Sequence, residues 1–266
     1  MNYKLTDQQQ SDFERDGYII WKQLFTADEM DLLLDIAKAD AVLSAEAYGR
    51  KDADGGVSRL ALRNDLDDST IYSAIARSRR VVESTTSLLG AEVYHYHHKM
   101  MLKEPRVGGA WEWHQDYGYW YKYGCLFPDM ASCLIAVDRA NKENGCLQVL
   151  TGSHKIGRIE HGQTGDQVGA DLERVEAAIE RLPLVYCEME PGDALFFHAN
   201  LLHRSDQNRS ENPRWSLICC YNTRHNDPFL KNGRHPNYSP LDIWEDDRVL
   251  EVGKSHWQSS RSDASP

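Results

Sequence analysis

Residues 93–103 read Val-Tyr-His-Tyr-His-His-Lys-Met-Met-Leu-Lys, a run of aromatic and apolar side chains without glycine or proline. Such a run is typical of a buried strand. Further short segments of this kind follow it, separated by turn residues, at 132–137, 146–150, 184–189, 194–197 and 216–221. We therefore predict an antiparallel β core, in the form of a jelly roll or double-stranded β-helix. A different β-sandwich is the alternative, because periodicity alone does not separate the two.

Helices are predicted before this β core. Thr6 and Thr26 each have a glutamine or glutamate three residues later, which is the pattern of a helix capping box, and apolar positions follow at helical spacing. The expected helices cover residues 7–16, 27–41 and 71–89. The fold class is thus mainly β, with N-terminal helices packed on one sheet.

The length of 266 residues suits a single domain, which we place at residues 1–252 with a helical insertion at about 162–182. Residues 253–266 are polar and are expected to form a disordered tail. Residues 49–58 combine glycine with charge and predict a mobile loop, of a kind that often covers a site.

Composition limits the classes of function. The formal net charge of −11 opposes binding to nucleic acid or anionic lipid, and no apolar stretch is long enough to cross a bilayer. The N-terminus lacks a secretory signal and the six cysteines show no Cys-x-x-Cys spacing, so a cytoplasmic protein with free thiols is expected. We predict a small-molecule substrate, no nucleic-acid or membrane partner, and a monomer or homodimer.

A candidate metal site begins with Trp-Glu-Trp-His-Gln-Asp at 111–116. On an extended backbone, His114 and Asp116 leave the same face and can share one metal. His203, downstream of another strand-like run, could complete a set of two imidazoles and one carboxylate. Such a set keeps positions on the metal open for substrate and oxygen, which indicates catalysis.

The pattern His-x-Asp is weak evidence alone, since about one occurrence is expected by chance. A second copy, at His225 and Asp227, has the candidate partners His235 and His256 but no arginine at strand spacing behind them. We interpret it as ordinary surface residues.

Arg214 and Ser216 strengthen the first set of ligands. If the segment of His203 and the next strand form a hairpin, the two side chains point inward together. A guanidinium fork and a hydroxyl can then bind one carboxylate of a dicarboxylate co-substrate.

The chain resembles the phytanoyl-CoA dioxygenase family over roughly residues 6–228. The motifs that carry the resemblance, in order, are His114-Gln-Asp116, Glu-Asn-Gly-Cys-Leu-Gln-Val-Leu-Thr-Gly-Ser-His at 143–154, Pro191-Gly-Asp193, His203-Arg-Ser205 and Arg214. The resemblance implies a double-stranded β-helix, Fe(II) on the two histidines and the aspartate, and 2-oxoglutarate on Arg214, with O2 as the oxidant. It also implies that Ser205 and His97 contact 2-oxoglutarate and that Lys99 faces the substrate. Asp116 stands where halogenating relatives have a small residue, so hydroxylation is expected.

The primary substrate is less well defined by the sequence. Tyr117 and Trp120 are the best aromatic candidates for its pocket, because they flank Asp116. Lys99, Arg63 and Arg158 are cations that could bind an anionic group, although surface ion pairs explain the two arginines as well. We expect a small polar or anionic metabolite, such as an amino acid derivative or an organophosphonate.

His95-Tyr-His97-His98 leaves an alternative open. On one regular strand His95 and His97 face together, as in the metal sites of some cupin-like proteins. The rivals are therefore a cupin-like metal-dependent hydrolase or isomerase, and a catalytically silent protein that binds metal and 2-oxoglutarate.

Overall fold

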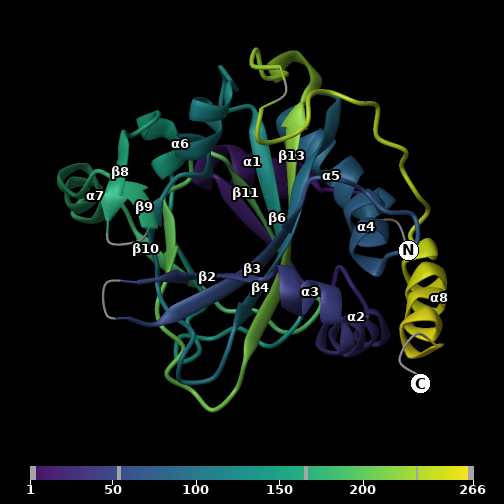
Figure 1. The fold of residues 1–266 in the computed structure, drawn as a ribbon. Coiled ribbons are helices and arrows are strands. Elements are labelled where there is room, and N and C mark those ends of the chain that lie inside the picture. The colour runs from purple at the N-terminus through teal and green to yellow at the C-terminus, as the bar shows by residue number, and fades with distance from the viewer. Residues whose placement is uncertain (1–3, 53–54, 165–166, 232, 263–266) are drawn as a thin grey trace.

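The computed structural model describes residues 4–52, 55–164, 167–231 and 233–262, and it consists of a helical layer and two main β-sheets (Figure 1). The larger sheet has the order β1-β11-β6-β13-β4-β3-β2, and the smaller has the order β10-β7-β12-β5. All their pairings are antiparallel. The mainly β architecture with a jelly-roll core is confirmed.

The strands of the larger sheet are β1 (Tyr18–Trp21), β2 (Tyr48–Lys51), β3 (Val57–Arg63), β4 (Val93–Lys103), β6 (Met130–Ala136), β11 (Ala194–His198) and β13 (Arg214–Thr223). Those of the smaller sheet are β5 (Trp111–His114), β7 (Leu147–Leu150), β10 (Leu184–Cys187) and β12 (His203–Ser205). A separate hairpin consists of β8 (His161–Thr164) and β9 (Gln167–Ala170). The predicted strands thus exist, with ends shifted by up to two residues.

The helices are α1 (Asp7–Asp16), α2 (Ala27–Ala39), α3 (Ala41–Glu46), α4 (Ile71–Arg77), α5 (Arg79–Leu89), α6 (Asp116–Trp120), α7 (Leu172–Ile179) and α8 (Arg248–Ser262). Short 3-10 turns are η1 (Tyr121–Tyr123), η2 (Ser153–Ile156) and η3 (Arg224–Asn226). Both predicted capping boxes are present, at Thr6 with Gln9 and at Thr26 with Glu29. The helix predicted over 71–89 is two helices, because the backbone of Ser78 is extended between α4 and α5.

Alternating side chains of the larger sheet enter two different cores. Cys133 of β6 and Cys219 of β13 pack with the apolar faces of the N-terminal helices, whereas Leu134 and Ile218 face the space between the two sheets. This is the alternation expected of strands that are buried on both faces. All six cysteines are buried and free, as predicted.

The loop predicted over 49–58 is wrong for much of its length. Tyr48–Lys51 and Val57–Arg63 pair as an antiparallel hairpin that extends the larger sheet beyond β4. Residues 53 and 54 lie outside the described residues. The glycine and charge in this segment belong to a hairpin at the sheet edge, where polar side chains can remain exposed.

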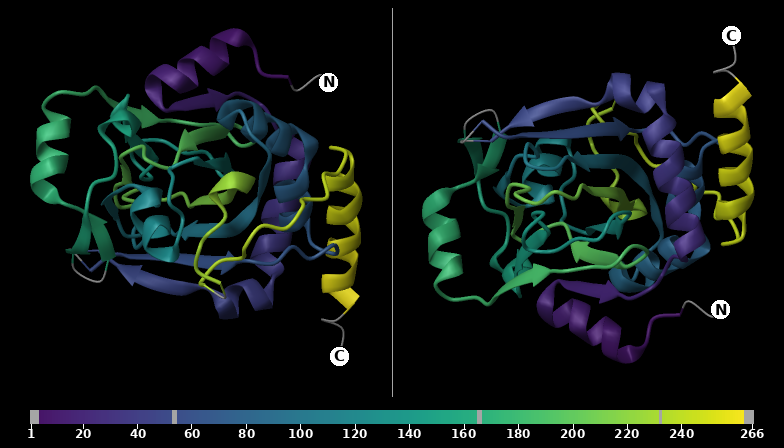
Figure 2. Two further views of the ribbon diagram at one scale, coloured as in Figure 1. Left: turned by 90° about the horizontal axis from the view of Figure 1, so that it is seen from above. Right: turned by 90° about the horizontal axis from the view of Figure 1, so that it is seen from below.

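The disordered tail predicted from residue 253 is also wrong as far as residue 262. These residues continue α8, which packs on α2 and α4 as the outermost element, on the side away from α7 (Figure 2). Val249 and Val252 are buried, and a Cβ at Gly253 would lie only 2.8 Å from side-chain atoms of Ile71 and Leu32. Gly253 therefore lets the helix approach closely, where the sequence suggested an end. Residues 263–266 lie outside the described residues.

The predicted insertion at about 162–182 contains α7 together with most of the β8–β9 hairpin. No helix in the described part of the chain combines the length and the apolar character that crossing a membrane requires.

Candidate active site

The predicted metal ligands lie together between the two sheets. His114 ends β5, Asp116 begins α6, and His203 begins β12, directly opposite His114 in the β5–β12 pairing. Oδ1 of Asp116 is 3.8 Å from Nε2 of His114 and 3.9 Å from Nε2 of His203, and the ligand atoms all lie within 4.8 Å of one another. Among the described residues, this is the only group of three or more histidine, cysteine or acidic side chains that could hold a metal.

Each of the three side chains is oriented by a hydrogen bond at the polar atom that does not face the other ligands. Nδ1 of His114 is 2.7 Å from the carbonyl of Glu112, and Nδ1 of His203 is 2.8 Å from the carbonyl of Leu201. The hydroxyl of Ser132 donates to Oδ2 of Asp116 at 2.9 Å. These bonds leave two Nε2 atoms and Oδ1 directed at one point, and carbonyl acceptors favour the tautomer with a free Nε2 lone pair.

Burial favours the neutral imidazole form of both histidines. It lowers the pKa of His203 and holds the pKa of His114 well below its ordinary value. Neutral imidazoles and a carboxylate are the ligands that non-haem Fe(II) takes in a facial arrangement. The residues present therefore fit such an ion.

An inner chamber adjoins these ligands and ends at a buried cation. Arg214 is 4% exposed, and within the described residues its guanidinium has no hydrogen bond or ion pair. The hydroxyl of Ser216, two residues along β13, is also buried without a partner. Burial lowers the pKa of Arg214 to about 10, which still leaves it charged at neutral pH. An unpaired buried cation is costly, so the chamber is suited to an anion.

The path to Arg214 differs from the predicted hairpin. His203 and Arg214 lie in different sheets, so the chain crosses from the smaller sheet to the larger between them. Arg214 nevertheless lines the space that His203 and Ser205 approach from the other sheet, and Ser216 shares its face of β13 without being among the residues that line that space.

Sequence reasoning missed Lys103, which contacts Ser205 of the inner chamber without itself lining that chamber. Lys103 is 1% exposed, pairs with Arg214 in the β4–β13 register, and donates to the hydroxyl of Ser205 at 2.9 Å and to the carbonyl of Asp206. Burial holds the pKa of Lys103 well below its ordinary value. Ser205 therefore lines the inner chamber with its hydroxyl fixed by a lysine that has no separate sequence signal.

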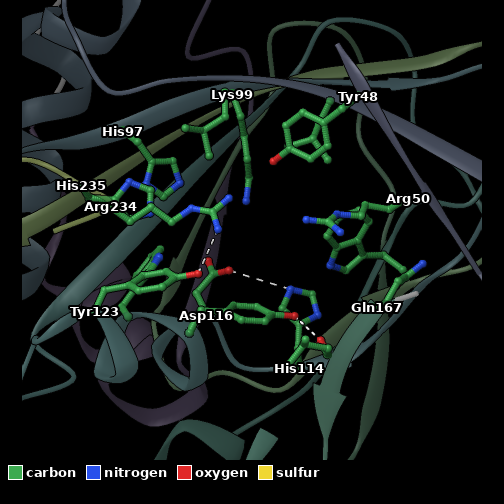
Figure 3. A pocket seen from close by; sticks show the side chains of 16 residues that line it. Tyr48, Arg50, His97, Lys99, His114, Asp116, Tyr123, Gln167, Arg234 and His235 are labelled. Carbon is green, nitrogen blue, oxygen red and sulfur yellow. Dashed lines mark hydrogen bonds and ion pairs between the residues drawn. The ribbon is translucent and has the colours of Figure 1, made fainter. Parts of the chain in front are cut away.

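An outer chamber opens on the other side of His114 and Asp116 (Figure 3). It shares Leu60, Lys99 and Trp111 with the inner chamber. Its remaining walls are Tyr48, Arg50, Leu62, His97, Tyr119, Trp120, Tyr123, Gln167, Val168, Arg234 and His235. Trp120 and Lys99 thus lie where a primary substrate would reach the metal ligands.

Tyr117 does not belong to either chamber wall, contrary to the prediction. Its hydroxyl bonds to the carbonyl of Leu126. The reason is that α6 begins at Asp116, so the spacing changes from two to three or four residues. Tyr119 and Trp120 therefore share the chamber with Asp116, and Tyr117 faces away.

The two arginines offered as substrate contacts are also elsewhere. Arg63 pairs with Glu46 at 3.0 Å, and Arg158 pairs with Glu160 at 2.9 Å. Neither lines the described part of the two chambers.

A β-bulge separates His95 from His97. Cys220 of β13 pairs with His97 and Tyr221 pairs with His95, which leaves Tyr96 as an extra residue. His95 then contacts His98 at 3.0 Å, and the prediction that His95 and His97 face together is wrong. His97, expected at 2-oxoglutarate, lines the outer chamber, stacked on His235 with ring centroids 4.6 Å apart.

The second His-x-Asp does not form a cluster. His225 is exposed and bonds Asp129 at 2.7 Å, whereas His235 lies in the outer chamber and His256 packs against Tyr72.

A double-stranded β-helix with two histidines and one carboxylate converging between its sheets defines the class of mononuclear non-haem metal oxygenases. The comparisons with known proteins agree. Residues 13–216 match the family described as phytanoyl-CoA dioxygenase (PhyH), and the chain belongs to this family. It is a dioxygenase of the class that uses non-haem Fe(II), 2-oxoglutarate and O2.

The similar proteins include relatives named as a dioxygenase and as a hydroxylase. The chain is 26% identical over 256 residues to ectoine dioxygenase of Stutzerimonas stutzeri. The aligned region covers 87% of this chain and 84% of the relative. It is 30% identical over 209 residues to L-proline trans-4-hydroxylase of Streptomyces griseoviridis, and the aligned region covers 73% of this chain and 76% of that relative. The crystal structure of EctD from S. alaskensis with 2-oxoglutarate and 5-hydroxyectoine has the same fold, with a TM-score of 0.73, 23% identity, and coverage of 91% and 88%.

Proposed function

We propose that this chain hydroxylates a C–H bond of a small polar or anionic metabolite and converts 2-oxoglutarate to succinate and CO2 in the same cycle. An amino acid derivative or an organophosphonate is the substrate that we favour. The relatives that act on ectoine and on L-proline support the small-metabolite class. The observation that carries the proposal is the convergence of His114, Asp116 and His203 beside the unpaired, buried Arg214.

In this proposal the chain's own residues fix the geometry of the reaction. His114, Asp116 and His203 would hold Fe(II), and Arg214 would bind the distal carboxylate of 2-oxoglutarate, with Ser216 and Ser205 as hydroxyl partners. Bound Fe(II) supplies the activation of O2 and the oxidation of both substrates. Anchoring the co-substrate at its far end leaves its keto acid end one orientation toward the metal ligands.

The outer chamber would then bind the primary substrate beside the metal ligands. Trp120 and Trp111 give its wall apolar surface, and His97 offers a neutral imidazole with no hydrogen-bond partner among the described residues. We propose that His97 contacts the ligands of the outer chamber. A cytoplasmic location and a monomeric or homodimeric state remain part of this proposal.

The test is an anaerobic titration of Fe(II) and 2-oxoglutarate, followed through the visible metal-to-ligand band and, after O2 is added, through succinate. The parent protein should give both signals. Asp116→Ala should raise the Fe(II) concentration needed for the band, because one of the three ligands is lost. Arg214→Ala should raise the 2-oxoglutarate concentration needed for it roughly a hundredfold, because a buried charge pair is lost. Arg158→Gln, which removes an exposed arginine outside both chambers, should change neither signal.

The same experiment separates the rivals. A hydrolase or isomerase gives no 2-oxoglutarate band, and a silent binding protein gives the band without succinate. No band in the parent protein would refute the proposed function.

A further inference from the structure

Three cations among the described residues line the outer chamber, and none of them pairs there with a described acidic side chain. Arg50 of β2, Lys99 of β4 and Arg234, in the segment after β13, come from separate parts of the chain (Figure 3). Within the described residues none of them forms an ion pair, and the only hydrogen bond of their charged groups joins Arg234 to the hydroxyl of Tyr123 at 3.3 Å. The guanidiniums of Arg50 and Arg234 also lie over the rings of Tyr48 and Tyr123. Figure 3 shows their charged ends directed from three sides into the space beside His114 and Asp116.

The local charge contrasts with that of the whole molecule. The chain has 41 acidic against 30 basic residues. Many arginines elsewhere in the described residues, including Arg15, Arg63, Arg79 and Arg158, pair with carboxylates. Asp116, itself a proposed metal ligand, is the one carboxylate among the described residues that line the outer chamber. A concave surface with one sign of charge attracts ligands of the opposite sign.

Counting charges shows that the reaction partners already proposed do not neutralise these cations. A divalent metal and Arg214 contribute three positive charges, and Asp116 with the two carboxylates of 2-oxoglutarate contributes three negative charges. These charges cancel, and Lys99, which lines both chambers, is not among them. Arg50, Lys99 and Arg234 remain as three positive charges for the ligand of the outer chamber.

We propose that the outer chamber selects a primary substrate with at least two negative charges, held by Arg50, Lys99 and Arg234 while its reacting carbon lies beside His114 and Asp116. This inference rests on the proposed function and narrows its substrate class. The head group is a compact dianion, either a phosphate or phosphonate or a pair of carboxylates. Arginine forks bind both kinds of oxyanion.

The test measures binding to the anaerobic Fe(II) and 2-oxoglutarate complex of the full chain at pH 8. Inorganic phosphate and malonate serve as dianions, methanesulfonate as a monoanion and malonamide as a neutral control. Each is titrated by calorimetry at constant ionic strength, while the visible band reports whether 2-oxoglutarate stays bound. At least one dianion should bind about tenfold or more tightly than methanesulfonate, with the band retained.

Variants then assign the effect to the chamber. Arg50→Gln and Arg234→Gln should each weaken dianion binding about tenfold and leave 2-oxoglutarate affinity unchanged, because neither residue lines the inner chamber. Lys99→Gln is less selective, since Lys99 lines both chambers. Arg158→Gln is the matched control and should bind dianions like the parent protein.

Each outcome has one meaning. Tight binding of phosphate alone assigns a phosphate or phosphonate head, and tight binding of malonate alone assigns a dicarboxylate. Equal binding of all probes, unchanged binding in both arginine variants, or loss of the band as dianion binds would overturn the inference. A parent protein without the band would instead reject the proposed function, and this inference with it.

Discussion

Ser132 shows how a residue outside the predicted motif can define the candidate metal site. It lies on β6 in the larger sheet, and its hydroxyl donates to Oδ2 of Asp116, which belongs to α6. The carboxylate is thereby fixed with Oδ1 toward the two histidines. Groups that orient a metal ligand in this way commonly contribute 10- to 100-fold to metal affinity.

Ser132→Ala should therefore lower Fe(II) affinity roughly 10- to 100-fold, with little change in thermal stability. Fe(II) titration in the presence of saturating 2-oxoglutarate measures the affinity through the visible band. Ser84→Ala is the control, because the buried hydroxyl of Ser84 donates to a helical carbonyl far from the ligands. Equal Fe(II) affinity in the Ser132 variant and the parent would show that the hydrogen bond does not position Asp116.

Single site residues could be predicted from the sequence where they belong to a recognisable sequence pattern. His114, Asp116, His203 and Arg214 were predicted from a spacing of two, from neighbouring strand-like runs and from the order of the family motifs, and the structure brings them together. Arg50 and Arg234 could not be found in this way, because only sheet pairing and a distant segment bring them to the outer chamber. Tyr117 was misplaced because a helix begins at Asp116, which a strand period does not anticipate.

Among the elements, α2 and α5 are joined by a buried ion pair. Glu29 and Arg80 are 4% and 2% exposed, and Arg80 also donates to the carbonyl of Leu24 and lies over the ring of Phe25. Glu29 has a second role, since its carboxylate accepts the backbone N–H of Thr26 in the capping box of α2. The side chain of Glu29 thus caps the N-terminus of α2 and also links α2 to α5.

Glu29→Ala should reduce the free energy of unfolding by about 3 kcal/mol, because it removes the buried carboxylate of Arg80 and leaves its guanidinium only the partly exposed Asp246 at 3.5 Å. Glu29→Gln should cost less, since its amide oxygen can still cap the helix. Chemical denaturation measures both. Glu83→Ala, on the exposed side of α5, is the control, and a similar loss there would refute a special role for the buried pair.

Helices and strands were predicted correctly where local sequence signals are strong. The prediction failed where pairing with a distant strand determines the structure. The capping boxes at Thr6 and Thr26 depend on neighbouring residues, and they were found. The β2–β3 hairpin depends on β4 as a template, so residues 49–58 resembled a loop. The bulge at Tyr96 depends on the register with β13, and no property of the His95–His98 segment alone reveals it.

In the whole molecule, the helical core that stabilises the fold and the chambers of the candidate site lie on opposite faces of the larger sheet. The chambers lie between the two sheets, whereas α2, α4 and α8 form a core on the opposite face of the larger sheet. Helix α8 is the outermost part of this layer (Figure 2). Disturbing α8 should therefore alter stability without altering the binding of Fe(II) or 2-oxoglutarate.

Val249→Ala tests this separation. Val249 is 0% exposed in the helical core, and losing its buried methyl groups together with the resulting cavity should cost about 1.5–3 kcal/mol. For a chain of this size the midpoint of thermal unfolding should fall by several degrees. The 2-oxoglutarate concentration that half-saturates the visible band, measured well below that midpoint, should equal that of the parent. Lys254→Ala, on the exposed face of the same helix, should leave both quantities unchanged. A weaker band in the Val249 variant at a temperature where it is fully folded would show that the helical layer and the chambers are coupled through the larger sheet.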